Sequence, residues 1–327
     1  MRLSVVIPTF NRRDRLARVL AALDAQRGEI SGGFECIVVD DGSEDGTAAL
    51  LRDAVLAGRL RSLSPGHGGP ARARNAGARA AAGEILVFLG DDTAPEPGFL
   101  LAHDRAHREG GAARAVLGYT GWDEARMRVT PLMRHLNERG LQFGFSLIAD
   151  RENVPFNFFY ASNVSLPRES FLALSGFDET FPYAAWEDVE FAYRARRAVP
   201  PLGIVYRPEA RARHDHPLSV LGFRRRQHLS GLAGAVFASK HPEMSDWLGV
   251  GEARHLGAVR PLRLSVLERV VRLADEAGLP LPGAMYDKLF RWDYLAGIRD
   301  GLAGGPASNA SGERDASAPP AKAGALH

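Results

Sequence analysis

Two adjacent carboxylates, Asp91 and Asp92, directly follow an apolar run at residues 85–89. A run of that length indicates a buried parallel strand, which puts the acids at its carboxyl end. In open α/β sheets ligands bind at that edge. Two neighbouring acids there repel each other and lose hydration unless a cation or hydrogen-bond donors compensate them. The pair therefore predicts a divalent metal ion between the protein and a phosphate.

A second acidic pair, Asp40 and Asp41, ends another apolar run within residues 35–42. Phe10 follows a third such run, where its ring could stack on a nucleobase, and Asp41 is placed to accept the imino hydrogen of a uracil-like ring. The glycine-rich loop 66–69 precedes several arginines, and this combination suits a phosphate. The alternative is that Phe10 belongs to the core and Asp40 caps a turn.

Two further clusters come later in the chain. Glu187 and Asp188 stand at the start of a predicted helix, residues 187–198, although the helix dipole favours acids there in any case. His214 and His216 flank an aspartate, and alternation along an extended segment puts their side chains on one side. Either imidazole could then reach a metal ion at the first acidic pair.

The 327 residues carry a net charge of +2, so overall charge gives no argument for nucleic acid as a partner. The single cysteine, Cys36, excludes an intrachain disulfide framework and lies in an apolar run, as an inert core thiol would. No apolar segment reaches the roughly 18 residues of a spanning helix, and the amino terminus lacks a signal-peptide layout. We therefore expect a cytoplasmic protein and leave peripheral contact with the inner face of the membrane open.

The spacing of apolar residues predicts a wound α/β fold. Asn11 is a candidate cap for the first helix, with Asp14 three positions later. Strands and helices then alternate, which is typical of a mostly parallel sheet with helices on both faces. The predicted strands are 3–8, 35–42, 85–89, 115–120 and 163–166, and the predicted helices are 47–60, 71–82, 169–174 and 187–198.

The carboxyl-terminal part has a different pattern. Residues 218–239 and 262–300 look helical, and the stretch from about residue 304 is rich in Ala, Gly, Ser and Pro, which predicts disorder. The first of these helices combines apolar residues with the arginines 224–226. Such a helix could rest on an anionic membrane, or it could pack on the rest of the protein.

Four segments together resemble the family-two glycosyltransferases. They are SerValValIleProThrPheAsnArg at 4–12, ValValAspAspGlySerGluAspGlyThr at 38–47, AlaArgAsnAlaGlyAlaArgAlaAlaAlaGlyGlu at 73–84 leading into PheLeuGlyAspAsp, and GlyPheAspGlu followed by TrpGluAspValGluPhe within 176–191. The order and spacing of four weak motifs make a specific signal. The resemblance covers about residues 1–215 and implies a GT-A fold.

The resemblance also implies roles for residues. Asp188 would be the general base that removes the proton from the acceptor hydroxyl. Glu187 and Trp186 would bind the acceptor, and Asp92 with His214 would hold Mn²⁺ or Mg²⁺. The implied nucleotide-binding residues are Pro8, Thr9, Phe10, Asp41, Arg74 and Asp91. Gly90 departs from the family, because most members carry a further acid at that position.

The resulting prediction is a metal-dependent, inverting glycosyltransferase. Its donor would be a nucleoside diphosphate sugar, UDP-sugar being favoured, and its acceptor a sugar, lipid-linked or other hydroxyl in polysaccharide, glycolipid or glycoconjugate synthesis. A catalytically impaired sugar-nucleotide- or glycan-binding protein is the main alternative, and a nucleotidyltransferase the other. The predicted parts are a transferase domain 1–215, with a nucleotide half 1–110 and an acceptor half 111–215, a helical extension 216–303 and a disordered tail 304–327.

Overall fold

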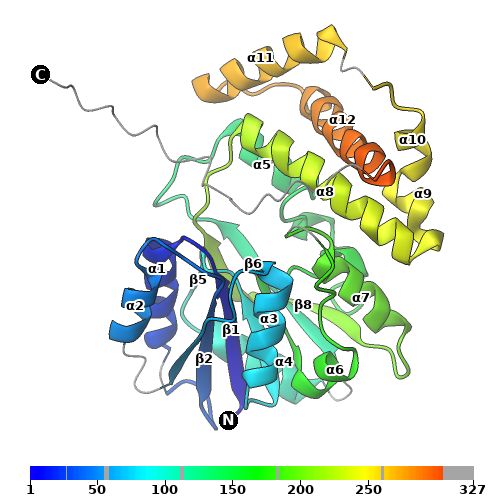
Figure 1. The fold of residues 1–327 in the computed structure, drawn as a ribbon. Coiled ribbons are helices and arrows are strands. Elements are labelled where there is room, and N and C mark those ends of the chain that lie inside the picture. Colours follow the sequence, from blue (N-terminus) through cyan, green and yellow to red (C-terminus); the bar gives the residue numbers. More distant parts are fainter. Residues whose placement is uncertain (27, 55–58, 111–113, 182–183, 259–260, 305–327) are drawn as a thin grey trace, which may run out of the picture. The chain divides into compact units, whose positions relative to one another are not determined.

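The computed structural model describes residues 1–26, 28–54, 59–110, 114–181, 184–258 and 261–304 (Figure 1). It contains two compact units, of which the first comprises residues 1–127 and 136–216, and the second residues 128–135 and those from 217 onward. Our prediction had assigned 128–135 to the transferase domain. The predicted disordered tail lies outside the described residues, apart from Gly304.

The first unit is built on an eight-stranded sheet in the order β3-β2-β1-β4-β7-β6-β8-β5. The strands β3, β2, β1 and β4 are parallel neighbours, β6 and β8 are also parallel, and β7 and β5 run antiparallel to their partners. The strand bounds are β1 Leu3–Thr9, β2 Phe34–Asp40, β3 Leu60–Leu63, β4 Ile85–Leu89, β5 Thr93–Pro95, β6 Arg114–Trp122, β7 Asn163–Pro167 and β8 Gly203–His214.

Helices cover both faces of this sheet, because successive strand residues point to opposite sides. Val5 packs in a core with α1 and α4, whereas Val6 packs in the other core with α3, α6 and α7. A Cβ at Gly77 would overlap the Val6 side chain, so α3 lies close against β1. The helices of this unit are α1 Arg13–Asp24, α2 Thr47–Asp53, α3 Gly69–Ala80, α4 Phe99–Glu109, α6 Arg168–Ala173 and α7 Glu187–Arg197, with 3-10 turns η1 Phe145–Leu147 and η2 Phe156–Phe158. Helix α5 Pro131–Glu138 begins within residues 128–135 of the second unit.

Two predicted features were wrong in detail. The helix predicted over 47–60 ends at Asp53, and Leu60 begins β3. The stretch 262–300 is helical as predicted, in two helices separated after Gly278, which has a positive φ of 75°. Asn11 does not cap α1: its side chain accepts from the Glu44 amide at 2.7 Å, and the Asp45 carboxylate accepts from a first-turn amide of α1 at 2.8 Å.

The second unit is helical. Its helices after residue 217 are α8 Val220–Lys240, α9 Ser245–Leu248, α10 Val250–Arg254, α11 Leu262–Ala277 and α12 Gly283–Leu302, with the 3-10 turn η3 Pro242–Met244. Helices α8 and α12 cross at Gly231 and Gly297, where a Cβ on Gly231 would overlap the Tyr294 carbonyl oxygen. Arg224 of α8 donates to the Asp293 carboxylate at 2.7 and 2.8 Å and pairs with Glu268. No helix among the described residues is long and apolar enough to cross a membrane.

Candidate active site

The acidic pair after β4 is buried and is held by residues from the end of β1. Asp91 and Asp92 are 5% and 8% exposed. The Thr9 hydroxyl donates to Asp91 at 2.8 Å. One guanidinium nitrogen of Arg12 lies 3.0 Å from Asp91 and 2.7 Å from Asp92, bridging the two carboxylates. A positive charge thus already compensates the pair, as two adjacent buried acids require.

The two acids differ in their electrostatics. Burial raises the pKa of Asp91 against the opposing charge of Arg12. Burial acts on Asp92 in the same direction, but His214 and Arg12 hold the pKa of Asp92 well below its usual range. Arg12 was not among the predicted site residues. Its position directly after the ProThrPheAsn strand end was the one signal in the sequence that could have suggested it.

The imidazoles of His214 and His216 also lie beside Asp92. Each has a ring nitrogen 3.5 Å from the same carboxylate oxygen. Pairing of β5 with β8 sets this position, because Thr93 faces His214 across the two strands. The rings of Trp122 and Phe143 pack on His214 at centroid distances of 5.3 Å each. The aromatic residues of the 122–160 region therefore enclose the histidine side of the site.

The chemistry of this donor set suits a divalent cation, since carboxylates and imidazole are common ligands of such ions. The Nδ1 atom of His214, which pairs with Asp92 through its other ring nitrogen, is buried and lacks a hydrogen-bond partner. Arg12 nevertheless occupies the shared side of the carboxylates. Within the described ranges, no group of three or more His, Cys, Asp or Glu side chains is arranged to hold a metal ion. The residues fit a metal in kind, and binding would require Arg12 to give way.

Gly90, at which the resemblance implied a further acid, lies in a tight space. A Cβ there would come within 2.8 Å of the Thr93 hydroxyl and 3.0 Å of an Asp92 oxygen. The GlyAspAsp triplet leads from β4 into β5, and β5 pairs with β8 rather than turning back on β4. The nucleotidyltransferase alternative rested on the GlyAspAsp triplet, which also occurs in polymerase palms, where it lies in a hairpin between two antiparallel strands. The triplet of this protein does not lie in such a hairpin, so it does not support that alternative.

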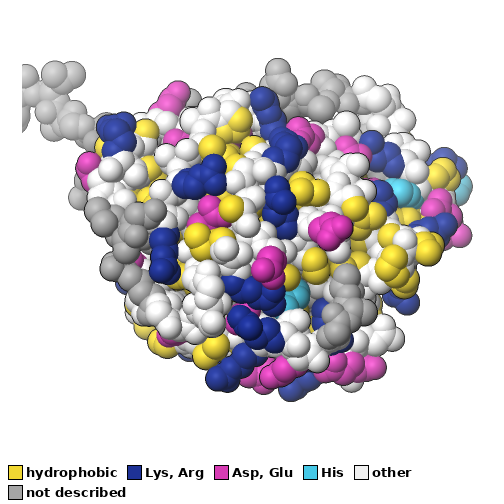
Figure 2. Space-filling model, turned by 90° about the horizontal axis from the view of Figure 1, so that it is seen from below, with side chains coloured by type: hydrophobic (Ala, Val, Ile, Leu, Met, Phe, Trp, Pro, Cys, Tyr) yellow, Lys and Arg dark blue, Asp and Glu magenta, His cyan; other side chains and the backbone are white. Residues whose placement is uncertain are grey.

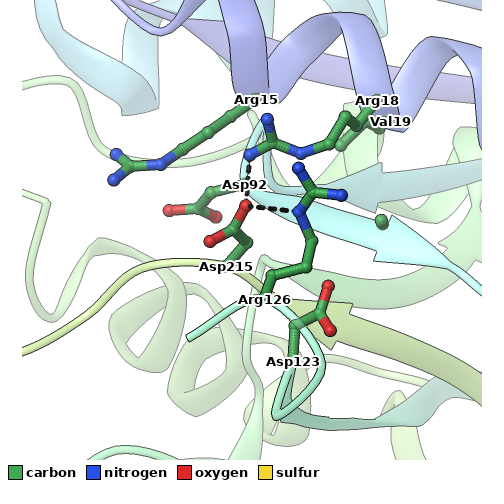
Figure 3. Close-up of a pocket in the computed structure, with 8 residues that line it drawn as sticks. Arg15, Arg18, Val19, Asp92, Asp123, Arg126 and Asp215 are labelled. Atoms are coloured by element: carbon green, nitrogen blue, oxygen red, sulfur yellow. Dashed lines mark hydrogen bonds and ion pairs between the residues drawn. The ribbon is translucent and has the colours of Figure 1, made fainter. Parts of the chain in front are cut away.

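A small cavity of about 160 Å³ adjoins Asp92 (Figure 3). Asp215 points into it and pairs with Arg18 of α1 and, at 3.6 Å, with Arg126. Because acids and arginines line the cavity together, its charges are largely balanced. The lining residues are Arg15, Arg18, Val19, Asp92, Ala94, Asp123, Arg126 and Asp215.

The predicted nucleotide-base end lies after β1 and β2. The Asp41 carboxylate accepts from the amides of Gly68 and Gly69 at 2.8 and 2.9 Å. Phe10 and Pro8, two residues earlier in β1, are both half-buried, and the Phe10 ring lies 4.9 Å from that of His67. Asp40 accepts from the Ser43 amide at 2.9 Å, so it does cap a turn. Through its bonds to the amides of Gly68 and Gly69, Asp41 holds the glycine-rich loop at the start of α3.

Helix α3 connects the nucleotide-base end to the pair Glu187 and Asp188 at the start of α7. The Arg74 guanidinium lies 2.9 Å from the Glu187 carboxylate, and their side chains are 11% and 4% exposed. Asn75 donates to the Phe177 carbonyl at 2.8 Å and accepts from the Phe177 amide at 2.9 Å. The two members of the ArgAsn motif thus hold different parts of the segment that leads to α7. Arg74 and Asn75 are 113 and 102 residues from these partners, so the local spacing of the motif could not predict the contacts.

Asp188, the predicted base, is held by backbone amides. Its carboxylate accepts from the Ala161 amide at 3.1 Å and from the Val189 amide at 2.9 Å. Burial raises the pKa of Asp188, and burial together with the Asp188 charge raises the pKa of Glu187 to about 7. Trp186 precedes them in the left-handed backbone region, with a φ of 72°. A raised pKa makes a carboxylate a better base near neutral pH.

These contacts form a continuous chain around the carboxyl edge of the sheet. The Ser162 carbonyl, next to the residue that binds Asp188, accepts from the Gly90 amide at 3.1 Å. At the other side, the Asp41 amide donates to the Thr9 carbonyl at 2.9 Å, while the Thr9 hydroxyl bonds to Asp91. The residues after β1 and β2, the pair Asp91 and Asp92, and the region of Asp188 are therefore connected along one edge of the sheet.

Fold and site together define a wound α/β protein with a cluster of acids at the carboxyl edge of its sheet. Residues 4–172, more than half of the chain, match Glycosyl transferase family 2. The chain belongs to this family, and the predicted membership is confirmed. Validoxylamine A glucosyltransferase from Streptomyces hygroscopicus subsp. jinggangensis is 33% identical over 214 residues, covering 59% of this chain and 50% of that protein. The chain thus spans about half the length of this curated relative.

Solved structures agree in fold. A mannosyltransferase from Pyrobaculum calidifontis, in complex with GDP-Man and Mn²⁺, has a TM-score of 0.60 at 17% identity, covering 92% of this chain and 87% of that one. S. aureus TarS 1-349 in complex with UDP-GlcNAc has a TM-score of 0.53 at 16% identity, with coverage of 93% and 91%. The predicted GT-A fold is confirmed. On the face drawn in Figure 2, basic and acidic side chains are interspersed, in keeping with the net charge of +2.

Proposed function

We propose that this protein transfers a sugar from a nucleoside diphosphate sugar to an acceptor hydroxyl, with inversion, in polysaccharide, glycolipid or glycoconjugate synthesis. The observation that carries the proposal is the link through residues 161 and 162. Asp188 binds the first of them, and the second binds Gly90 beside the acidic pair. We therefore assign Asp188, the proposed base, and the pair Asp91 and Asp92 to one site. The pair lies at the sheet edge where open α/β sheets bind their ligands.

In the proposed reaction Asp188 accepts the proton of the acceptor hydroxyl. The hydroxyl oxygen forms a bond to the anomeric carbon as the bond from that carbon to the diphosphate breaks. The amides of Ala161 and Val189 hold the carboxylate in one orientation, so little reorganisation is needed. Glu187 and Trp186 bind acceptor hydroxyls, and Arg74 keeps Glu187 oriented.

The donor lies along the other part of the edge. Phe10, beside Pro8, stacks on the base, and Asp41 accepts its imino hydrogen, which is why UDP-sugar is favoured. Thr9, Arg74 and Asp91 complete the nucleotide site. Asp92 and His214 hold Mn²⁺ or Mg²⁺, which, when bound, supplies positive charge against the leaving diphosphate. The complexes of the structural neighbours contain GDP-Man and UDP-GlcNAc, so the choice of base is a proposal of its own.

The decisive experiment combines donor binding with donor turnover. A panel of UDP- and GDP-sugars is tested with and without Mn²⁺, first by calorimetry and then by product analysis. Asp188→Asn should bind the donor like the wild type and lose transfer by about 10³-fold or more, because Asn can still accept one backbone bond but cannot take a proton. The control is Asp150→Asn, an exposed aspartate of the same unit.

The outcomes separate the parts of the proposal. Absence of metal-dependent donor binding would contradict the enzyme, and unchanged transfer by Asp188→Asn would contradict the base. Retention of anomeric configuration would exclude inversion. Gly90 favours one alternative, a protein that binds a sugar nucleotide or glycan without turning it over, and donor binding without transfer to any acceptor would support that alternative.

The proposal also includes a cytoplasmic protein with peripheral membrane contact. Cys36 is buried and free, which suits a reducing compartment.

A further inference from the structure

Helix α11 (Leu262–Ala277) carries apolar side chains on two opposite sides. Leu264 and Val271 are buried in the second unit, with 3% and 0% exposure. On the other side the apolar residues are exposed to solvent. Leu262, Val266, Val270 and Leu273 are 80%, 56%, 43% and 59% exposed.

The exposed residues form one continuous face. Their spacings of four, four and three positions bring them to the same side of a helix. Leu279, which is 60% exposed, follows directly after the helix, where its amide donates to the Ala274 carbonyl at 2.8 Å. We call Leu262, Val266, Val270, Leu273 and Leu279 the α11 apolar face. A contiguous face of this kind usually marks an interaction site.

Arginines border this face on both sides. At about 100° per residue, Arg263 lies at one edge of the stripe and Arg269 at the other. Both side chains are exposed. Glu276, an exposed acid about 20° from Arg269 around the helix, pairs with Arg272 at 3.5 Å. The border of the α11 apolar face thus holds three arginines and one acid, and its net charge is positive.

We propose that the α11 apolar face docks on an anionic lipid surface. Aliphatic side chains would enter the interface between headgroups and acyl chains, and Arg263 and Arg269 would lie among anionic headgroups. Charge complementarity favours lipid over a second copy of the chain. A two-fold contact between two such faces would bring together the four guanidinium groups of Arg263 and Arg269, and the two Glu276 carboxylates nearby are already paired with Arg272.

The same reasoning weakens helix α8 as the membrane contact that its sequence suggested. Phe223 is buried, and Arg224 is engaged by Asp293 and Glu268 within the second unit. Leu221 is the large apolar side chain of α8 that is exposed, at 48%. The inference deepens the peripheral contact of the proposed function, but it does not depend on the transfer reaction.

The test is co-sedimentation of the full chain with vesicles of phosphatidylcholine alone and of phosphatidylcholine mixed with phosphatidylglycerol. The wild type should bind the anionic vesicles preferentially. The double variant Leu262→Ser/Leu273→Ser should bind at least ~10-fold more weakly, because two large aliphatic groups are lost from the interface. Arg263→Gln/Arg269→Gln should abolish the preference for phosphatidylglycerol. Leu221→Ser is the matched control and should bind like the wild type.

Circular dichroism and thermal unfolding check that each variant is folded. We expect all of them to fold, because the substituted side chains are exposed. Equal vesicle binding by the wild type and the double leucine variant would overturn the proposal, and so would wild-type protein that remains in the supernatant. A concentration-dependent dimer that Leu273→Ser abolishes would instead identify a second copy as the occupant. Transfer to a water-soluble acceptor should be unchanged in all these variants, so failure of the proposed activity would be recognised separately.

Discussion

Two pairs of adjacent carboxylates lie at the same sheet edge, and they are stabilised by different means. The pair after β4, Asp91 and Asp92, contacts a guanidinium that bridges both members, and two imidazoles lie close to Asp92. The pair at the start of α7, Glu187 and Asp188, has Arg74 on its first member, while backbone amides bind its second. Of these four carboxylates Asp92 is the one whose pKa is lowered, whereas burial raises the pKa of Asp91, Glu187 and Asp188 even though a guanidinium contacts the first two.

This difference sets Asp92 apart from the other three carboxylates. Neighbouring positive groups lower the pKa of Asp92, which keeps that carboxylate charged and suited to bind cations. Burial raises the pKa of Asp188 and Glu187, which suits proton transfer near neutral pH. The different roles proposed for Asp92 and Asp188 thus follow from what surrounds each carboxylate.

The largest expected effect separates the two members of the β4 pair. Asp92→Asn should lower kcat by on the order of 10²- to 10³-fold, because the variant would bind less well the divalent cation that supplies positive charge at the leaving diphosphate. Asp91→Asn, the matched neighbour, should raise the donor KM with a smaller effect on kcat. Steady-state kinetics over a range of Mn²⁺ concentrations measure both. If Asp91→Asn has the larger effect on kcat, the assignment of the two acids is reversed.

The next effect concerns the compensation of the α7 pair. Arg74→Met leaves Glu187 buried without its partner and should lower the free energy of unfolding by about 3 kcal/mol. The double variant Arg74→Met/Glu187→Gln should recover most of that loss, because no unpaired charge remains. Arg79→Met, on the same helix and 60% exposed, is the control and should have little effect. Denaturant unfolding gives all four values, and a double variant as unstable as Arg74→Met would show that the ion pair is not the cause.

A smaller effect follows from the pKa of Glu187, which is raised from 4.5 to about 7. The folded protein then holds a proton between those values that the unfolded chain releases, so this contribution to stability is present at low pH and is lost as pH rises through 7. Relative to Glu187→Gln, the wild type should lose about 2 kcal/mol of unfolding free energy between pH 5 and pH 8. Parallel pH profiles of the two proteins would contradict the raised pKa.

The long apolar strands and the acids that follow them could be predicted from the sequence. β1 and β4 are buried on both faces, so their residues are nearly all hydrophobic. β5 has three residues, too few for a pattern of its own, and β8 alternates small buried alanines with exposed arginines over 210–213, which is a weak hydrophobic signal. Both pair with neighbouring strands of the sheet. Such strands depend on tertiary context.

The partners of the site residues were harder to predict than the residues themselves. Glu187 and Arg74 are 113 positions apart, and Arg12 is 80 positions from Asp92. Local spacing shows which side chains follow a strand, but it does not show which of them meet across the sheet edge. Asn11 illustrates the same limit, because Asp45 from the neighbouring loop supplies the α1 contact that Asn11 was expected to make.

The smallest expected effect tests whether Arg12 and a divalent cation compete for the β4 pair. Arg12→Met removes the guanidinium 2.7 Å from Asp92, so Mn²⁺ alone should bind about 10-fold more tightly than to the wild type. Electron paramagnetic resonance of free Mn²⁺ measures this without turnover. Arg13→Met, an adjacent arginine with a side chain 55% exposed, is the control. Equal affinity of all three proteins would mean that Arg12 does not oppose the cation, and weaker binding by Arg12→Met would mean that the guanidinium orders the carboxylates for it.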